Sequence, residues 1–355
     1  MTRIPDGTPA PAPPQTRRWR LGSVPWQDIQ PVGPARTRVI IDNDFSGDPD
    51  DLFQLVHHLL SSNVEIPLVV GSHLRPDDPF DPSGRSARNA VAIVRDVFAR
   101  LGLESTEVIA QGADAALTDP RTPQPSAAAD AIIEEALRED PRPLFYVAGG
   151  GLTDIASAYL LEPRIAERLT LVWIGGGEHD GVAPPPPGAM PIEYNLLIDV
   201  VAGQVVFSDS TIPIWQVPRD VYRQCLVSEA ELRLRVAPTG PVGRYLYEEL
   251  VEVNRRTLGE GRGPGETYAL GDSPLVLLTA LQSLFEPDPS SSAYLEKPTP
   301  RLGADGRYTE RPDGRPMRLY TRVDTRLMFE DFYLKLAEFS RWQQDENRIN
   351  GGTHR

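Results

Sequence analysis

The stretch 38–51, RVIIDNDFSGDPDD, joins a short β-branched run to a dense acidic turn. The apolar residues Val39, Ile40 and Ile41 follow one another without polar alternation, which is typical of a strand buried on both faces. Acidic residues follow at positions 42, 44, 48, 50 and 51, and a segment of helical periodicity then runs to about residue 60. This stretch predicts a buried strand, a turn and a helix, which is the repeating unit of α/β folds.

The same alternation of apolar strands and amphipathic helices continues along the chain. Further strands are predicted at 66–70, 108–110, 144–147, 171–174, 212–217 and 318–323. Helices are predicted at 86–101, 128–137, 152–161 and near 200–207, and then at 229–236, 242–258, 274–284 and 329–342. This pattern indicates an α/β fold with a mostly parallel, doubly wound central sheet and a more helical C-terminal half. Segment 287–315 is rich in Pro, Ser, Gly and Asp, and we expect a long surface loop or hairpin there.

Composition narrows the class of partner. The 355-residue chain carries a formal net charge of -14. This balance disfavours nucleic acids and anionic membranes, because both attract Lys- and Arg-rich surfaces. No apolar run approaches the roughly 18 residues that a membrane helix needs. The single cysteine, Cys225, cannot form an internal disulfide, which fits a cytoplasmic location.

The N-terminal part of the chain differs from the rest. Residues 1–36 are rich in Pro and have no strand or helix period. We expect an N-terminal extension there, followed by a single domain over 37–345 and a tail over 346–355. Trp19 and Trp26 lie in the extension, and tryptophan side chains need a surface to pack on. We therefore expect the extension to dock on its own domain or on a neighbouring subunit.

The acidic turn needs a source of positive charge. Its five carboxylates would repel one another strongly unless a cation neutralised them. Calcium takes about six to eight oxygen ligands in flexible geometry, so Ca²⁺ is the predicted ion and Mg²⁺ the stricter alternative. Favourable placement of Asp50 and Asp51 in the first turn of a helix is another explanation, but it accounts for only two of the five acids.

Other segments are expected at the same edge of the sheet, because right-handed crossovers bring the carboxyl ends of parallel strands together. Glycine triplets at 149–151 and 175–177 each follow a predicted strand, and a backbone carbonyl there can join a calcium shell. Asp272 stands just before a helix that begins with proline, and this carboxylate is either a helix cap or a ligand.

Taken in order and spacing, these motifs resemble the nucleoside hydrolases. The similar segments are VIIDND at 39–44, the acidic pair at 50–51, GGGLTDIA at 149–156, LEPR at 161–164, WIGGG at 173–177, EYN at 193–195, ID at 198–199 and Asp272. The resemblance runs from about residue 38 to residue 339. The acidic turn of this chain is two residues longer than the familiar short form.

The resemblance implies a calcium-dependent hydrolysis of the N-glycosidic bond in a ribonucleoside or related ribosyl compound. The implied calcium ligands are Asp44, Asp51, Asp272 and the carbonyl of Gly149. Asp44 is also the implied general base for the attacking water. The family further implies a homodimer or homotetramer.

The resemblance also implies the sugar contacts. Asp50 and Asn195 are expected to bind the ribose 2′- and 3′-hydroxyls, and Glu193 the 5′-hydroxyl. A carboxylate with an amide suits vicinal hydroxyls, because together they supply acceptors and donors. Asp42 is expected to support the turn, whereas Asp48 has no implied role.

The leaving-group side departs from the family pattern. Many members have a histidine directly before the aspartate matched by Asp272, and this chain has Gly271. Segment 111–127 contains no histidine where many members have a His-Gly motif, and SHLR at 72–75 replaces the expected asparagine. His73 and His179 are therefore the candidate residues for protonating the leaving group.

Four further residues are candidates for substrate contacts. Trp215 and Tyr268 are candidates for stacking on the base or hydrogen bonding to it. Arg75 and Arg219 are candidates for binding a substrate with an additional acidic group.

Two other functions are compatible with parts of the sequence. A catalytically impaired calcium- and sugar-binding protein would explain the missing histidines. A phosphatase of the haloacid dehalogenase type would use Asp42 as nucleophile and Asp44 as acid/base, but it leaves the pair Asp50 and Asp51 without a role.

Overall fold

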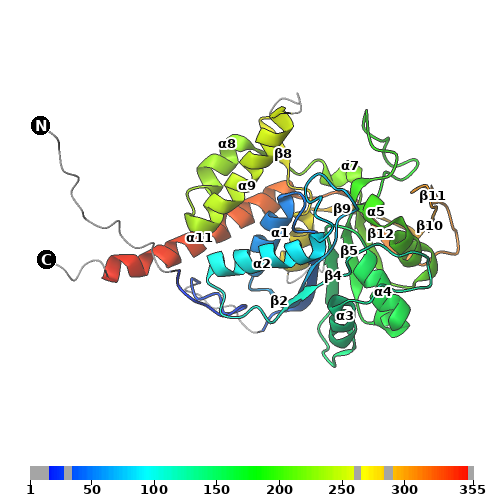
Figure 1. Cartoon of the computed structure of the whole chain (residues 1–355), viewed down its shortest axis with the longest axis horizontal. Helices are drawn as coiled ribbons and strands as arrows, with labels where there is room; N and C mark the ends of the chain where they lie inside the picture. Colours follow the sequence, from blue (N-terminus) through cyan, green and yellow to red (C-terminus); the bar gives the residue numbers. More distant parts are fainter. Residues whose placement is uncertain (1–15, 28–33, 260–264, 284–290, 351–355) are drawn as a thin grey trace, which may run out of the picture.

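A computed structural model describes residues 16–27, 34–259, 265–283 and 291–350. Its centre is an eight-stranded sheet with the order β3-β2-β1-β4-β5-β6-β12-β9 (Figure 1). The strands are β1 Thr37–Asn43, β2 Val64–Gly71, β3 Ile109–Gln111, β4 Leu144–Ala148, β5 Thr170–Ile174, β6 Ile214–Val217, β9 Ala293–Pro298 and β12 Pro316–Arg322. All neighbours pair in parallel except β9, which is antiparallel to β12. The predicted mostly parallel sheet is confirmed.

Helices follow most of the strands. Their bounds are α1 Asp50–Leu59, α2 Ser86–Leu101, α3 Ala127–Leu137, α4 Thr153–Leu161, α5 Tyr194–Ile198, α6 Val200–Gln204, α7 Arg219–Tyr222, α8 Glu229–Glu231, α9 Gly240–Gly259, α10 Pro274–Ala280 and α11 Thr325–Asn350. Short helical turns η1 Pro163–Glu167, η2 Val205–Asp209 and η3 Leu232–Val236 complete them. Two minor sheets pair β7 Leu226–Ser228 with β8 Thr267–Ala269, and β10 Arg301–Leu302 with β11 Tyr308–Thr309. None of the helices in these ranges is long and apolar enough to cross a bilayer.

The helices cover both faces of the sheet, as the alternation in β1 shows. Val39 and Ile41 belong to one buried cluster, together with residues of α1, α2, α9, α10 and α11. Ile40 belongs to the other, together with residues of α3, α4 and α6. Figure 1 shows these two groups of helices on opposite sides of the strands. Burial on both faces explains why these strands are almost wholly apolar.

The site is positioned by the change of direction in strand order. From β1 the chain moves outward to β2 and β3, and it then returns to place β4 on the other side of β1. Asp42 of β1 pairs with Ala148 of β4 at the carboxyl ends of the two strands. The loops that begin at Asp44 and Gly149 therefore leave the sheet next to each other. Ligands of open α/β sheets bind at such a switch point.

The segment 287–315 departs from the prediction. A loop or hairpin was expected, and the pair β10 and β11 is indeed a small hairpin. The prediction missed β9, which forms the antiparallel edge of the main sheet, whereas residues 287–290 lie outside the described ranges. An edge strand is paired on one side only, and β9 has half-exposed or exposed side chains throughout, so its sequence lacks the apolar run of a central strand.

The described part of the predicted extension packs on the same chain. Trp19 is 2% exposed and its Nε1 donates a 2.7 Å hydrogen bond to the carbonyl of Leu101. The ring of Trp26 lies 5.1 Å from that of Phe339 and 5.8 Å from that of Trp342, both on α11. Residues 1–15 and 28–33 of the extension, and 351–355 of the predicted tail, lie outside the described ranges, and α11 itself continues to Asn350.

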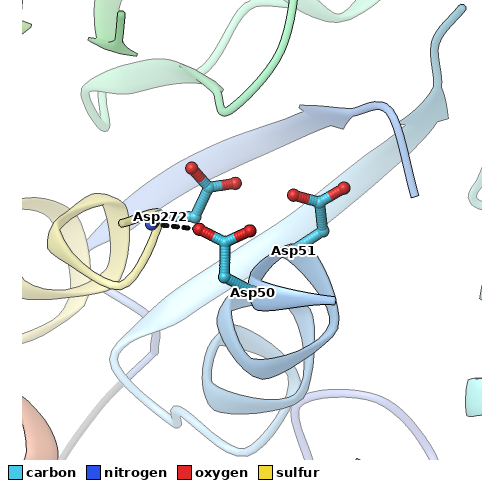
Figure 2. Close-up of side chains that lie close together, drawn as sticks. All are labelled: Asp50, Asp51 and Asp272. Atoms are coloured by element: carbon cyan, nitrogen blue, oxygen red, sulfur yellow. Dashed lines mark hydrogen bonds between the residues drawn. The ribbon is translucent and has the colours of Figure 1, made fainter. Parts of the chain in front are cut away.

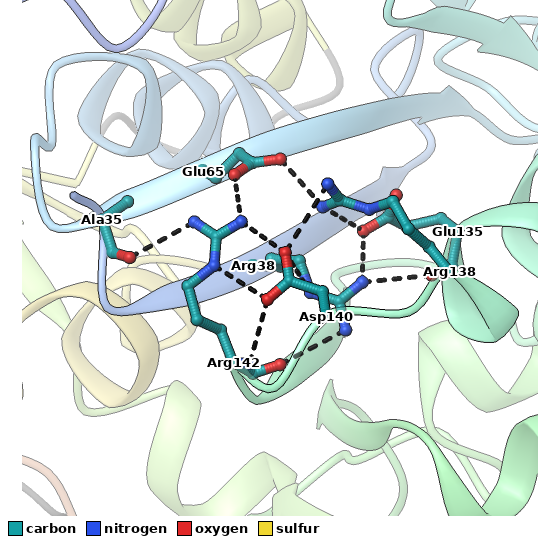
Figure 3. A network of polar contacts seen from close by, with 7 residues as sticks. All are labelled: Ala35, Arg38, Glu65, Glu135, Arg138, Asp140 and Arg142. Atoms are coloured by element: carbon teal, nitrogen blue, oxygen red, sulfur yellow. Dashed lines mark hydrogen bonds and ion pairs between the residues drawn. The ribbon is translucent and has the colours of Figure 1, made fainter.

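An ion-pair network lies at the amino ends of the central strands, which is the end of the sheet opposite the acidic turn (Figure 3). Arg38 at the start of β1 is 2% exposed, and its Nη1 donates to Oε1 of Glu135 at 2.6 Å. Its Nη2 donates a 3.2 Å hydrogen bond to the carbonyl of Arg142, a residue that lies just before β4. Arg142 in turn pairs with Glu65 at the start of β2. This network joins three elements at the amino ends of their strands, far from the acidic turn.

Candidate active site

A cavity of about 250 Å³ opens at the carboxyl ends of β1, β4 and β5. Its walls come from the acidic turn, the first glycine triplet, the EYN motif and the loop before α10. The lining residues are Asp44, Asp48, Asp50, Asp51, Phe80, Gly149, Ile174, Glu193, Tyr194, Asn195, Tyr222, Ala269, Gly271 and Asp272. The volume lies just below the roughly 300–1,000 Å³ of typical small-molecule sites.

Three carboxylates converge in this cavity (Figure 2). Asp50, Asp51 and Asp272 each place one oxygen within 4.8 Å of the other two. Asp50 and Asp51 are the first residues of α1, and Asp272 precedes α10, so the cluster joins segments that are far apart in the chain. Oδ2 of Asp51 is buried without a hydrogen-bond partner. Buried polar atoms are normally paired, so an unpaired carboxylate oxygen here fits a ligand for a cation.

Glycine allows the acids to approach the backbone. A Cβ on Gly149 would lie 2.1 Å from Oδ2 of Asp272, and a Cβ on Gly150 would lie 2.8 Å from Oδ1 of Asp44. Both distances are too short for any other residue type without a shift. The first glycine triplet is therefore a steric requirement for bringing Asp44 and Asp272 to the same place.

The electrostatics of the cluster also fit a cation. Burial is the main cause that raises the pKa of Asp44 well above its usual range, and the negative charge of Asp272 is the second cause. Burial, followed by the charge of Asp44, raises the pKa of Asp51 in the same way. Burial raises the pKa of Asp272 to about 7. Carboxylates that resist ionisation together become stable as anions beside a divalent ion, and an all-oxygen set suits Ca²⁺ or Mg²⁺.

The residues predicted to bind sugar line the same cavity. Nδ2 of Asn195 donates to the carbonyl of Gly149 and, at 2.9 Å, to the carbonyl of Ile174. Oε2 of Glu193 accepts the backbone N–H groups of Gly176 at 2.7 Å and Leu196 at 3.1 Å. These bonds fix both side chains at the cavity wall. Of the predicted metal and sugar residues, all seven therefore lie together: Asp44, Asp50, Asp51, Gly149, Glu193, Asn195 and Asp272.

The two histidines predicted to protonate the leaving group, His73 and His179, lie outside this cavity. The ring nitrogens of His73 contact the carbonyl of Leu74 and the hydroxyl of Thr153, both at 2.9 Å. His179 contacts Oε1 of Gln216 at 2.9 Å and stacks on Tyr308 with ring centroids 4.2 Å apart. Neither histidine is among the residues that line the cavity, and His179 lines a separate one.

Of the two aromatic residues predicted to contact the base, only Tyr268 bonds to a residue of the cavity lining. The ring of Trp215 packs against Phe145 with centroids 5.2 Å apart, away from the cavity lining. Tyr268 donates its hydroxyl hydrogen to Oδ1 of Asp48, which does line the cavity.

The two candidate arginines are paired with acids outside the cavity lining. Nε of Arg75 donates to Oδ2 of Asp78 at 3.0 Å. Nε and Nη2 of Arg219 donate to the carboxylate of Glu178 at 2.8 and 2.6 Å.

Three aromatic residues of the wall were missed in the sequence. Phe80, Tyr194 and Tyr222 line the cavity together with the acids. The hydroxyl of Tyr194 donates to buried Asp78 at 2.6 Å, and Oδ1 of Asp78 accepts the backbone N–H of Phe80 at 3.0 Å. Tyr194 lies inside the EYN motif, which is a signal that sequence reasoning could have used. Phe80 carries no such signal, because only the fold of its loop brings it here.

Comparison with known proteins gives the family. A family model described as inosine-uridine preferring nucleoside hydrolase matches residues 39–326. Inosine-uridine preferring nucleoside hydrolases of Leishmania major and Crithidia fasciculata are 34% identical over 140 residues and 36% identical over 126 residues. These matches cover 38% and 34% of this chain, and 43% and 37% of the two relatives. The chain thus spans less than half the length of these curated relatives.

Solved structures agree in fold. A purine-preferring ribonucleoside hydrolase from Gardnerella vaginalis superposes with a TM-score of 0.62 at 19% identity, covering 86% of this chain and 100% of that one. An inosine-uridine preferring nucleoside hydrolase from Bacillus anthracis gives 0.60 at 18% identity, covering 85% and 99%. At such identities the likeness concerns the fold, while the family match covers most of the chain. The chain belongs to the inosine-uridine preferring nucleoside hydrolase family.

Proposed function

We propose that this protein hydrolyses the N-glycosidic bond of a ribonucleoside or related ribosyl compound with the help of calcium. The observation that carries the proposal is the convergence of Asp50, Asp51 and Asp272 in a cavity that Asp44, Glu193 and Asn195 also line. This combination offers a hard-cation site next to groups that suit a sugar.

The ion would be held by carboxylates of Asp44, Asp51 and Asp272, with the carbonyl of Gly149. The partnerless Oδ2 of Asp51 supports this assignment. Asp50 also places an oxygen in the cluster with Asp51 and Asp272, and it accepts the backbone N–H of Asp272 at 3.2 Å. When bound, the cation neutralises these acids and activates a water molecule for attack.

The side chains of this chain would perform the remaining steps. Asp44 accepts a proton from the attacking water as general base. The water oxygen bonds to C1′ of the sugar, the C1′–N bond breaks, and its electron pair passes to the base nitrogen. The carboxylates around the sugar stabilise the positive charge that develops in the transition state. Asp50 and Asn195 bind the 2′- and 3′-hydroxyls, and Glu193 accepts the 5′-hydroxyl.

The test is release of free ribose from a panel of purine, pyrimidine and modified ribonucleosides. The full chain is stripped with EDTA and then assayed with CaCl₂ or MgCl₂. We expect turnover that depends on the added ion, and a loss of at least about a hundredfold in Asp44→Asn. Glu107→Gln, an exposed acid outside the cavity, should retain full activity. Absence of ribose release from every substrate with calcium present would reject the proposal.

We also propose a homodimer or homotetramer in the cytoplasm. The family resemblance supports the assembly, and the single buried cysteine, Cys225, is compatible with a reducing compartment. Sedimentation equilibrium of the full chain tests the assembly, and a single monomeric species at micromolar concentration would contradict it.

A further inference from the structure

The charge of the cavity is one-sided. Its described lining contains six carboxylates, those of Asp44, Asp48, Asp50, Asp51, Glu193 and Asp272. No Lys, Arg or His side chain lines it within the part of the chain that the structure describes. A divalent ion would compensate for only part of this charge, so the cavity favours a positively charged ligand over a neutral or anionic one.

The tyrosine hydroxyls at and beside the cavity already donate hydrogen bonds to carboxylates. Tyr222 donates to Oε1 of Glu193 at 2.7 Å, and Tyr268 donates to Oδ1 of Asp48. Tyr194 donates to Asp78 at 2.6 Å. Burial and these carboxylates raise the pKa of each tyrosine well above its usual range, so all three are weak proton donors.

The position before Asp272 is occupied by Gly271, which has no side chain that could donate a proton. A Cβ on Gly271 would lie 3.3 Å from the ring of Tyr222 and 3.3 Å from Oδ2 of Asp50. A side chain at this position would therefore require a small shift of Tyr222 or Asp50. Together with the distant positions of His73 and His179, the glycine at this position leaves no imidazole at the described cavity wall to protonate a departing base.

Some substrates do not need this proton. A neutral nucleoside releases its base as an anion unless an acid protonates it, and general acid catalysis is commonly worth about 10²–10⁴ in rate. An N-ribosylpyridinium or an N7-alkylated purine riboside carries a positive ring, and its base leaves as a neutral molecule. The aromatic rings of Phe80, Tyr194 and Tyr222 line the same cavity, and aromatic rings also attract a cationic aromatic ring.

We propose that the preferred substrate is a ribonucleoside with a cationic heteroaromatic base. The base would be held by Asp48 and by the aromatic rings of Phe80, Tyr194 and Tyr222. This inference rests on the proposed N-glycosidase function and specifies its substrate class. In the reaction the water oxygen bonds to C1′ and the C1′–N bond breaks. The bond pair neutralises the ring nitrogen, and the proton of the water passes to Asp44. The products are ribose, a neutral heterocycle and one proton.

The test compares 7-methylinosine with inosine on the full chain with CaCl₂, because one methyl group adds the positive charge. We expect the kcat/KM for 7-methylinosine to exceed that for inosine by at least about a hundredfold. The KM for 7-methylinosine should rise with KCl because salt screens the attraction, while the KM for inosine should not. Nicotinamide riboside serves as a second cationic probe and should behave like 7-methylinosine.

Matched variants separate recognition from the intrinsic lability of the cationic substrate, which is the same for every variant. Asp48→Asn should lower the preference for 7-methylinosine about tenfold, because it removes a negative charge from the cavity lining. Tyr268→Phe breaks the same hydrogen bond but keeps the carboxylate, so it should retain the preference. Equal loss in both variants would show that the Asp48–Tyr268 bond is only structural and would overturn the inference.

The remaining outcomes distinguish the two proposals. Turnover of inosine with no change of preference in Asp48→Asn and no salt effect on 7-methylinosine would overturn the cationic-substrate inference and leave the N-glycosidase function standing. Failure to release ribose from inosine, 7-methylinosine and nicotinamide riboside with calcium would overturn both.

Discussion

The side-chain amide of Asn43 donates a 2.6 Å hydrogen bond to Oδ2 of Asp272, although the two residues are 229 positions apart. Asn43 is the last residue of β1, and Asp272 stands before α10. The bond fixes one oxygen of Asp272, while its carboxylate stays beside those of Asp50 and Asp51. Asn43 thus orients a proposed calcium ligand without itself belonging to the acidic cluster.

Replacing Asn43 with alanine should weaken calcium binding. Loss of a group that orients a metal ligand typically costs about 10–100-fold in metal affinity, and we expect a change in this range. Calorimetric titration of the EDTA-treated protein with CaCl₂ measures it. Asn89→Ala is a matched control, because Asn89 bonds Asp81 on a half-buried site away from the cavity. Equal calcium affinity in Asn43→Ala and the wild type would contradict the assignment.

Replacing Gly150 with alanine should displace Asp44. The new Cβ would lie 2.8 Å from Oδ1 of Asp44, which is shorter than any comfortable contact. We expect calcium affinity and ribose release to fall together by at least about tenfold. Gly177→Ala is the control from the other triplet, because its Cβ would meet only a side-chain nitrogen of Arg219 at 3.9 Å. If the two variants behave alike, the close approach of Asp44 is not required.

The stability of the calcium-free protein should depend on pH. Burial raises the pKa of Asp272 from 3.8 to about 7, and the pKa values of Asp44, Asp50 and Asp51 are also raised. At these four carboxyl groups the folded state binds more protons than the unfolded chain between about pH 4 and pH 7, so their contribution to stability falls as pH rises through this window. Burial lowers the pKa values of His57 and His179 to about 4, which acts in the opposite direction. Bound calcium should offset the repulsion and raise Tm by about 5 °C or more at pH 7.5, and by less at pH 5.

Thermal melts in EDTA and in CaCl₂ across this range check the effect. The variant Asp51→Asn, which removes one of the repelling charges, should be more stable than the wild type in EDTA at pH 7.5. It should also respond less to calcium. A wild-type Tm in EDTA that rises relative to that of Asp51→Asn from pH 5 to pH 7.5 would contradict the predicted sign.

Replacing Arg38 with methionine should destabilise the fold without altering the chemistry. Arg38 is 2% exposed and pairs with Glu135. Its loss would leave Glu135 with Arg138 as ion-pair partner and would remove a buried donor from the carbonyls of Glu135 and Arg142. Removing one member of a buried ion pair costs about 3 kcal/mol or more in the free energy of unfolding. The exposed pair of Arg168 and Glu139 is the control, and Arg168→Met should cost under about 1 kcal/mol. Urea unfolding measures both, and equal costs would contradict a structural role for the network.

Much of the fold follows from local sequence. Strands such as 39–41 and 144–147 are apolar because helices cover both of their faces, and this burial is visible as an uninterrupted run. The edge strand β9 has no such run, because its side chains are half-exposed or exposed and its pairing with β12 depends on a distant segment. Local patterns therefore predicted the centre of the sheet and missed its margin.

By itself the sequence determined the acidic turn and its place after a buried strand, because these follow from local order and from strand direction. The residues proposed for metal and sugar came from the ordered motifs that resemble the nucleoside hydrolases. Only the tertiary structure decided which other residues line the cavity. It placed His73 and His179 away from the cavity and brought Phe80 and Tyr222 to its wall. The physical reason is that loops from separate crossovers build the cavity wall, and their approach depends on packing between segments that no local pattern records.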